Sequence, residues 1–544
     1  MRRIVLAIAA IVVVTAAGLW FGARHEVGSD AMPAVDADAG PAERGAAAFV
    51  GADFGGLSLH ALESHAVPWK LVTAALVLEA VDGDPTQSAD LKTLNNLLAS
   101  FGFLVQTRVQ NMPEGVPDRP DALPLGITHG VLSPLAGLPV QVANMGCAAC
   151  HAGVTYRTDG QPDPTAAWIG MPNTSLNLEA YTQAVFRTLK AYQDAPARLM
   201  EMVGTLYPET GWRERQALRW LVLPMVRARL DQIPGDRPLP FFNGVPGSTN
   251  GVAALKHVFD VPLLGDGLAD AGIVSIPDLG HRHWRSSLLV DGAYAVPQTE
   301  RQAETTAADN TAEKRAALAA ITTFFTVPSM GVHPSKAIEA VPVAEEIYAF
   351  LNSAYNSQPF PAVINDDLAL AGSAVYAAEC AACHGAYNVE DGKPKLVSFP
   401  NWLGEVGTDP LRAAAFTEDL ADTFRDTPYR DQIAVARTEA YVAPPLDGIW
   451  ASAPYLHNGS VPTIWHLLTP DARPETFELG GHMLEFTRLG LRLEDGRYPA
   501  DYVPFSEPVI LDTTHPGLGN GGHDFGATLS DEDKTALIEF LKQL

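Results

Sequence analysis

The pentapeptide CAACH occurs twice in this chain, in GCAACHAGV (146–154) and in ECAACHGAY (379–387). The 544 residues contain only four cysteines, and all four lie in these two copies. Histidine is also scarce, at 15 residues, so a histidine directly after both cysteine pairs is not a chance outcome. These two stretches therefore decide how the rest of the sequence is interpreted.

The C-x-x-C-H pattern is the attachment signature of c-type haem. Its two thiols bond to the two vinyl groups of one porphyrin, and the adjacent histidine supplies the proximal nitrogen to the iron. The sequence thus predicts two covalently bound haems. The expected attachment residues are Cys147, Cys150 and His151 for the first haem, and Cys380, Cys383 and His384 for the second.

Three other uses of paired cysteines fit less well. A thioredoxin-like C-x-x-C needs no following histidine and expects a βαβ setting. A zinc site could combine the two pairs, but it would not require a histidine after each. Structural disulfides suit an exported chain, but the three-residue spacing on a helix is unfavourable for them. With all four cysteines bound to haem, we expect no disulfide.

The composition bounds the class of protein. The formal net charge of −26 at pH 7 argues against nucleic-acid binding, because binding to phosphate needs clustered lysine and arginine. An acidic surface keeps a protein soluble and can also steer a cationic partner. The apolar content of 47% is ample for buried cores, and 544 residues exceed one ordinary core, so two or more domains are expected.

Residues 1–22 have the pattern of an export segment, with two arginines followed by an apolar run from Ile4 to Phe21. The run is longer than the roughly 7–15 residues of a cleaved signal and lies near the lower limit, roughly 17 residues, of a bilayer span. No A-x-A site follows it, which favours an uncleaved anchor. Because the arginines precede the run, the rest of the chain should lie outside the cytoplasm. We expect a periplasmic protein, either soluble or tethered to the inner membrane.

The remaining chain divides into three parts. Residues 23–56 are rich in Ala, Gly, Asp and Pro without an apolar period, which predicts a flexible tether. Residues 57–355 are expected to form an N-terminal haem domain with a helical insertion, because 177–204 and 212–231 show a 3.6-residue apolar period. A linker separates them from a C-terminal cytochrome c domain at 364–544. The predicted fold is mainly α, with two cytochrome c-like haem domains and long loop-rich and helical insertions.

The segment APPLDGIWASAPYLHNGSVPTIWHLL (443–468) resembles the bacterial di-haem cytochrome c peroxidase superfamily, which carries P-x-L-x-N/G before P-Y-F-H-D-G-S. The matching residues are Pro445, Leu446, Gly448, Pro454, Tyr455, His457, Gly459 and Ser460. More of the chain is similar to the branch that contains the rubber oxygenases, at LPLGIT…GCAACHAG, AGSAVYAAECAACHGAY, PYLHNGSVPT and NGGHDFGATLSDEDK. The likeness covers residues 120–160 and 340–544.

The resemblance implies two haems that exchange electrons, the C-terminal one as a relay and the N-terminal one as the reactive centre. In the peroxidases a methionine fourteen residues after the P-Y-F-H-D-G histidine often ligates the second haem, but Asp471 stands at that place here. The rubber-oxygenase branch uses a histidine near the C-terminus, which His523 matches. We therefore expect His384 and His523 to be the axial pair of the second haem, with His457 and Met483 as alternatives.

The sixth ligand of the first haem is not fixed by the sequence. The available side chains are His257, His281, His283, His333 and Met171, and an open position is the alternative. In HRHW (281–284) a histidine could move the proton of bound peroxide as an acid or a base. A solvated basic loop is the plainer interpretation of the same residues.

The peroxidases also place a tryptophan between their haems. Aligning Pro277 and Asp291 with that pattern puts Val290 at the tryptophan position, so Trp284 is the candidate substitute, or else a packed loop aromatic. The candidate catalytic residues are thus His281, His283 and Trp284.

Together these features predict an exported di-haem oxidoreductase whose first haem reacts with peroxide or dioxygen. One alternative is a pure electron-transfer cytochrome with both irons six-coordinate, and another is an oxygenase that cleaves an apolar alkene. The expected partners are a small redox protein of the cytochrome c or cupredoxin type, together with peroxide, dioxygen or a small organic substrate.

Overall fold

The computed structural model describes residues 30–57, 66–105, 107–119, 123–135, 137–265, 268, 271–390 and 393–544. The export segment expected at residues 1–22 lies outside these ranges. Within them, no helix is both long and apolar enough to span a bilayer.

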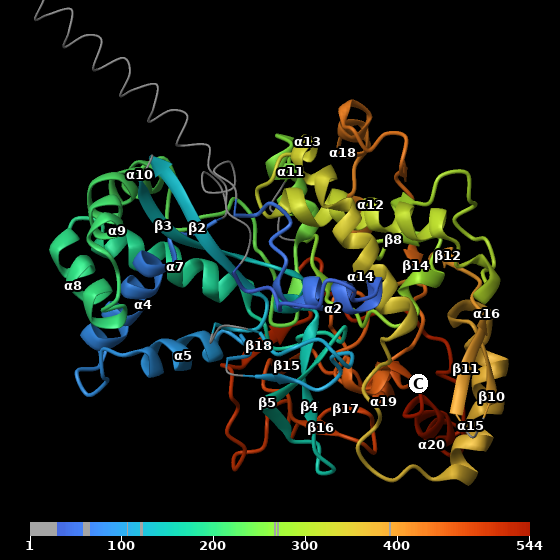
Figure 1. The fold of residues 1–544 in the computed structure, drawn as a ribbon. Coiled ribbons are helices and arrows are strands. Elements are labelled where there is room, and N and C mark those ends of the chain that lie inside the picture. Colours follow the sequence, from blue (N-terminus) through green and yellow to red (C-terminus); the bar gives the residue numbers. More distant parts are fainter. Residues whose placement is uncertain are drawn as a thin grey trace, which may run out of the picture.

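A helical lobe occupies one end of the molecule, on the left in Figure 1. Its elements are α4 (Trp69–Gly83), α5 (Leu91–Ser100), the hairpin of β2 (Ile127–Leu135) and β3 (Leu138–Met145), α7 (Leu178–Tyr192), α8 (Pro196–Leu206), α9 (Trp212–Ala217), the π-helical turn η1 (Leu218–Val222) and α10 (Leu223–Leu230). The side chains of Asp90 and Asn177 cap α5 and α7 by accepting from backbone N–H groups in their first turns. Helix α4 is buried along its first ten residues, so the other helices pack around it.

A second group of helices lies beside the lobe. It contains α2 (Pro41–Gly51), α11 (Gly251–Val258), α12 (Ala312–Ser329), α13 (Pro334–Ala337) and α14 (Val341–Ser353). Residues 23–56 were expected to form a flexible tether, but residues 41–51 of this segment form α2, which is buried against α14. A Cβ at Gly45 would lie 1.9 Å from the carbonyl oxygen of Glu346, so the glycine and the alanines after it let the two helices approach closely.

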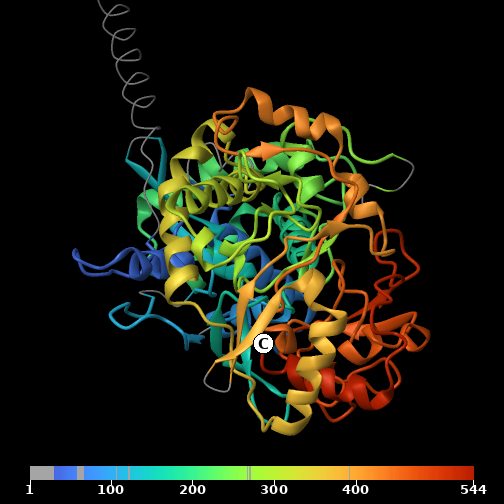
Figure 2. The same ribbon diagram turned by 90° about the vertical axis from the view of Figure 1, so that its right-hand side faces the viewer.

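The C-terminal part is built on two packed helices, α15 (Asp366–Glu379) and α20 (Asp531–Leu541), seen from the side in Figure 2. They touch at Gly372, where a Cβ would lie 1.9 Å from the carbonyl oxygen of Ala536. The short helices α16 (Ala381–His384) and α19 (Ile464–Leu467) contact this pair. The other two short helices, α17 (Leu411–Ala415) and α18 (Glu418–Thr423), share a hydrophobic core with α11 and α12 instead.

Short strands connect these helices, and no sheet among the described residues has more than three strands. They are β1 (Arg108–Val109), β4 (Ala152–Tyr156), β5 (Pro162–Ile169), β6 (Ser248–Thr249), β7 (Val274–Ser275), β8 (Ser287–Leu288), β9 (Tyr294–Ala295), β10 (Ala386–Glu390), β11 (Lys393–Ser398), β12 (Leu403–Gly404), β13 (Ala434–Val435), β14 (Tyr441–Val442), β15 (Thr476–Leu479), β16 (Leu484–Glu485), β17 (Gly490–Leu491) and β18 (Val509–Asp512). The strands β4 and β5 pair antiparallel directly after the first CAACH motif.

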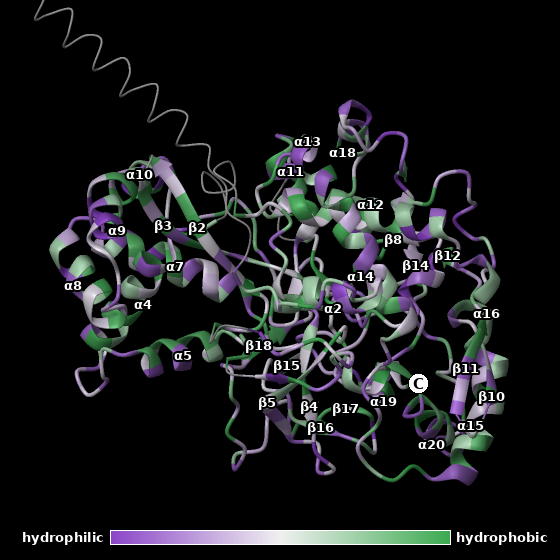
Figure 3. Ribbon diagram, in the orientation of Figure 1, coloured by the Kyte–Doolittle hydropathy of each residue, from purple (hydrophilic) through white to green (hydrophobic). Residues whose placement is uncertain are grey.

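The largest hydrophobic core crosses the expected domain boundary at residues 356–363. It joins Phe49 and Tyr156 from the N-terminal side to Trp450 and Leu537 from the C-terminal side. The ring of Tyr156 meets that of Trp450 edge to face, with centroids 5.7 Å apart. Hydrophobic and hydrophilic bands alternate along most helices, as expected for elements with one face in a core (Figure 3).

Candidate haem-binding site

The first motif forms the short helix α6 (Cys147–Cys150), between β3 and β4. Gly126 packs directly on its backbone, with φ of +81° and with the position of a Cβ only 1.8 Å from the Ala149 nitrogen. The carbonyl oxygen of Gly126 accepts a hydrogen bond from the Gly146 N–H at 2.8 Å. A glycine is therefore required where the β2 strand begins, because any side chain would displace the motif.

The second motif begins where α15 ends and continues as α16. Gly385, with φ of +95°, then turns the chain into β10. Both copies of CAACH thus lie in a single helical turn that is held in place by a neighbouring element.

Each motif histidine donates a hydrogen bond to a proline carbonyl oxygen. The Nδ1 atom of His151 lies 3.1 Å from the Pro277 oxygen, and that of His384 lies 2.8 Å from the Pro444 oxygen. A carbonyl oxygen only accepts, so Nδ1 carries the proton and Nε2 keeps its lone pair. Metal-binding histidines are commonly oriented in this way.

The two prolines belong to matching P-x-L segments, 277–279 and 444–446, that the sequence reasoning did not single out as a pair. Leu279 and Leu446 both line the cavity described below. The repeat of P-x-L is the signal that could have identified both acceptors.

The two P-x-L loops interlock. A Cβ at Gly280 would lie 2.3 Å from the Asp447 Cβ, and a Cβ at Gly448 would lie 2.5 Å from the Asp278 carboxylate. The Nδ1 atom of His281 also lies 2.6 Å from Asp447. The loops that orient the two motif histidines therefore share one packing unit.

One cavity of about 1910 Å³ connects both motifs. Cys147, Cys150 and His151 line it on one side, and the second motif lines it with Cys380, Cys383 and His384. This volume exceeds the roughly 300–1,000 Å³ of a usual small-molecule pocket, which fits large prosthetic groups.

His523 lies opposite His384 across this cavity. Their ring centroids are 6.2 Å apart and their planes differ by 53°. Two imidazoles that ligate one first-row metal from opposite sides, at roughly 2 Å per nitrogen, have ring centres roughly 6 Å apart. The spacing therefore fits an iron between the two rings.

Buried arginines line the same cavity and fit the carboxylates of a haem. Arg282 donates to the Asp278 carbonyl oxygen at 3.0 Å, and Arg285 donates to that of Leu289 at 3.0 Å. Neither guanidinium has a carboxylate within ion-pair distance in the described part of the chain, and burial lowers the pKa of both. A bound anion would offset the cost of burying these cations.

Protonation states at the motifs also fit haem ligation. Burial lowers the pKa of His151 and of His523 to about 4, which keeps both imidazoles neutral, as a metal ligand must be. Burial raises the pKa of Cys147 and Cys380 to about 12, so both sulfurs lie in surroundings that favour an uncharged form.

The alternative uses of the cysteines do not appear in the described residues. The four cysteines form no disulfide. Within the described ranges, no three or more His, Cys, Asp or Glu side chains are grouped as a metal site would require, so the zinc arrangement is not formed there.

The HRHW cluster contributes one residue to the cavity wall. Arg282 lines it, but the side chains of His281, His283 and Trp284 are not part of the wall. Burial opposes protonation of His281, but the neighbouring Asp447 outweighs it and raises the pKa of this histidine. These three residues follow the Pro277 loop that orients His151, and their catalytic role stays a prediction.

The other ligand candidates separate into three groups. His257 and His457 line the cavity, and the ring of His457 stacks on Tyr441 with centroids 4.3 Å apart. Met171 and Met483 are buried in the protein away from the cavity wall. His333 is exposed and caps α13 through its side chain. The methionines that line the cavity are Met145, Met225 and Met330, which the sequence reasoning did not propose.

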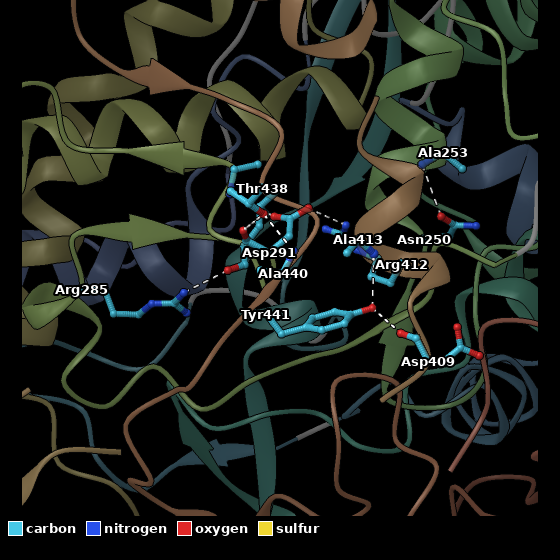
Figure 4. Close-up of polar contacts among 12 residues, drawn as sticks. Asn250, Ala253, Arg285, Asp291, Asp409, Arg412, Ala413, Thr438, Ala440 and Tyr441 are labelled. Carbon is cyan, nitrogen blue, oxygen red and sulfur yellow. Dashed lines mark hydrogen bonds and ion pairs between the residues drawn. The ribbon is translucent and has the colours of Figure 1, made fainter. Parts of the chain in front are cut away.

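A buried ion pair supports the cavity wall next to Tyr441 (Figure 4). Arg412 and Asp291 are 2.8 Å apart and almost fully enclosed. The Tyr441 hydroxyl accepts from the Ala413 N–H at 3.2 Å and donates to the Asp409 carbonyl, which ties β14 to α17. This network holds Tyr441 under the His457 ring.

Comparison with known proteins gives the class of this region. A family model described as RoxA-like, cytochrome c-like matches residues 440–478, which include the acceptor Pro444 and His457. The chain therefore carries a RoxA-like, cytochrome c-like segment, and such a segment implies covalently bound haem.

Two relatives come from Sinorhizobium fredii (strain NBRC 101917 / NGR234). Uncharacterized protein y4iJ is 25% identical over 505 residues, which cover 78% of this chain and 82% of the relative. Uncharacterized protein y4iM is 31% identical over 195 residues, which cover 30% of this chain and 43% of the relative.

Proposed function

We propose that the protein is an exported c-type oxidoreductase with two haems of unequal role. The haem at Cys380, Cys383 and His384 would relay electrons, and the haem at Cys147, Cys150 and His151 would react with peroxide or dioxygen. The main support is that both motifs line one cavity. Among the described residues, a second histidine ring lies opposite His384, but none lies opposite His151.

The chain supplies orientation and charge balance. The Pro277 and Pro444 carbonyl oxygens fix the rings of the two motif histidines. Arg282 and Arg285 are placed to bind carboxylates. Haem supplies one-electron redox chemistry and, where its sixth position is open, a site for peroxide or dioxygen.

Export to the periplasm is part of the proposal and is supported by the pattern of residues 1–22. A small cationic redox protein of the cytochrome c or cupredoxin type is the proposed electron partner, because an acidic surface is complementary to such a partner.

Spin state tests the unequal roles. The ferric protein, as isolated, should give one low-spin and one high-spin signal in electron paramagnetic resonance, and the reduced protein should bind carbon monoxide at one haem per chain. Only low-spin signals, together with no binding of carbon monoxide, would support the electron-transfer cytochrome without a reactive haem and reject the proposal.

A second candidate function is oxidative cleavage of an unsaturated apolar substrate. It is favoured by an arm of the cavity that runs between α7 and α10 and is lined by Leu178, Tyr181, Val185, Phe186, Leu189 and Val222, and by the RoxA-like match. Cleavage of one C=C bond by one dioxygen would place one oxygen atom on each carbon and give two carbonyl products. Oxygen-dependent carbonyls from a panel of unsaturated hydrocarbons would support this activity, and their absence across the panel would reject it.

A further inference from the structure

The helical segment formed by α9, η1 and α10 (residues 212–230) has one buried and one exposed face. The buried face packs into the lobe through Ala217, Leu218, Val222, Leu223 and Leu230. The exposed face carries large apolar side chains, with Trp212 at 70%, Trp220 at 67% and Met225 at 46% exposure. Exposing two tryptophans on one surface helix is unfavourable in water unless something covers them.

The same segment is basic, although the chain as a whole is acidic. Residues 212–230 contain five arginines and one acidic residue, Glu214. Glu214 is already neutralised by Lys70 at 2.7 Å. The Arg213 guanidinium lies over the Trp212 ring, and that of Arg219 lies over the Trp220 ring, 4.9 Å from its centre.

Two of the five arginines are engaged within the protein. Arg215 donates to the carbonyl oxygens of Thr210 and Pro208, and Arg227 pairs with the exposed Asp194 at 2.9 Å. Arg213, Arg219 and Arg229 make no ion pair within the described chain. Three cations on the exposed face are therefore available to an anionic partner.

We propose that residues 212–230 dock on the surface of a bilayer that contains anionic phospholipid. Tryptophan prefers the boundary between lipid headgroups and acyl chains, and arginine binds lipid phosphate. Helices that lie in a membrane interface combine these two residue types on one face. The acidic remainder of the chain does not prevent docking, because charges more than roughly 10 Å away are screened at physiological salt.

The cavity reaches the surface at this docking face. Met225, Ala228 and Arg229 are exposed on α10 and also line the cavity. A docked protein would thus present the outer end of the cavity arm between α7 and α10 to the lipid. An apolar molecule could then enter the cavity from the bilayer without crossing water, which is favourable for any substrate of low solubility.

Amide hydrogen exchange of the full, haem-loaded chain tests the proposal locally. Vesicles of phosphatidylglycerol and phosphatidylethanolamine should slow exchange in peptides from residues 212–230, and phosphatidylcholine vesicles should have a smaller effect. This readout is independent of the N-terminal segment, which could bring the protein to vesicles by itself. It is also independent of which reaction the haems perform.

Two double variants sharpen the test. R213Q/R219Q should weaken protection of residues 212–230 by anionic vesicles about tenfold or more in lipid concentration, since each basic residue near such a surface contributes about 1 kcal/mol. W212A/W220A should abolish it on both kinds of vesicle. The matched control R425Q/R430Q removes two exposed arginines of the C-terminal part and should leave protection unchanged.

Three results would overturn the proposal. The first is no protection of residues 212–230 by anionic vesicles. The second is equal protection in the wild type and in both test variants. The third is protection that appears without lipid as the protein concentration rises, which would mean that a second copy of the chain covers this face.

Discussion

His384 and His523 face each other across one cavity with ring centroids 6.2 Å apart, although they belong to segments at opposite ends of the C-terminal part. His384 is held by the Pro444 carbonyl oxygen, and the backbone of His523 is held by its N–H bond to the Val406 carbonyl at 2.7 Å. The ring of His384 and the backbone of His523 are thus both held by the protein, which reduces the entropy lost on ligation.

Replacing His523 by alanine should convert one low-spin haem to a high-spin or carbon monoxide-binding form, because the iron next to His384 loses its second imidazole. Electron paramagnetic resonance and the carbon monoxide difference spectrum measure the change. H333A is the control, since His333 is exposed and outside the cavity wall. An unchanged spectrum of H523A would remove His523 from the ligand set.

Replacing Asp291 by asparagine should destabilise the protein by about 3–5 kcal/mol, because it leaves the buried Arg412 guanidinium without a counter-charge. Chemical denaturation followed by circular dichroism gives the free energy of unfolding. The exposed pair of Asp422 and Arg425 provides the control, and D422N should cost less than about 1 kcal/mol. Similar losses in both variants would contradict this account of the ion pair.

Stability should fall as the pH drops below about 6.5, in part because of His482. Burial lowers the pKa of His482 to about 3, so in the folded protein this ring, next to the Tyr156 hydroxyl at 2.9 Å, stays neutral when it would be protonated in the unfolded chain. The contribution of His482 to the free energy of unfolding is complete above the pKa of histidine in the unfolded chain. It is lost between roughly pH 6.5 and 3, by at most about 1.4 kcal/mol per pH unit.

The H482Q variant isolates that contribution. Its free energy of unfolding should depend less steeply on pH between 6 and 4 than that of the wild type, whatever its stability at neutral pH. H333Q removes a surface histidine and should keep the wild-type slope. A wild-type slope in H482Q would show that this histidine does not drive the acid sensitivity.

Replacing Gly126 by alanine should reduce haem attachment at the first motif while leaving the second motif loaded. The new Cβ would occupy the place of the α6 backbone at Ala149. Haem stoichiometry from the pyridine haemochrome spectrum, with mass spectrometry of peptides that contain each motif, measures the loss. G83A is the control, because nothing lies within 4 Å of a Cβ at Gly83. Full loading of both motifs in G126A would contradict the required close approach.

The sequence was most informative where short motifs carry chemistry. The sequence resemblance implied His384 and His523 as an axial pair; their rings lie 6.2 Å apart, and ligation by His523 stays a prediction. The spacing of the motifs could not reveal the acceptors Pro277 and Pro444, because every residue has a backbone carbonyl oxygen. Only a comparison of the two P-x-L segments with each other indicates that these two carbonyls have the same role.

Composition was least informative where packing decides. The Ala- and Gly-rich residues 41–51 have the composition of a tether, yet they form α2, because small side chains allow a close approach to α14. The catalytic role of the HRHW cluster stays a prediction, because Arg282 lines the cavity but the side chains of His281, His283 and Trp284 do not. The position of α2 depends on its contact with α14 rather than on local propensity, so composition could not predict it.

The interlocked loops at residues 277–281 and 444–448 limit how this protein can be recombined. Consider a hybrid that joins the first half of this chain to the second half of a relative. Its Gly280 and Asp278 would come from this chain, but the residues that pack on them, at positions 447 and 448, would come from the relative. A larger residue at either glycine position would displace these loops, and with them the carbonyl oxygens that orient the two motif histidines. The halves are thus not interchangeable modules, and a working chimaera must inherit both loops from the same parent.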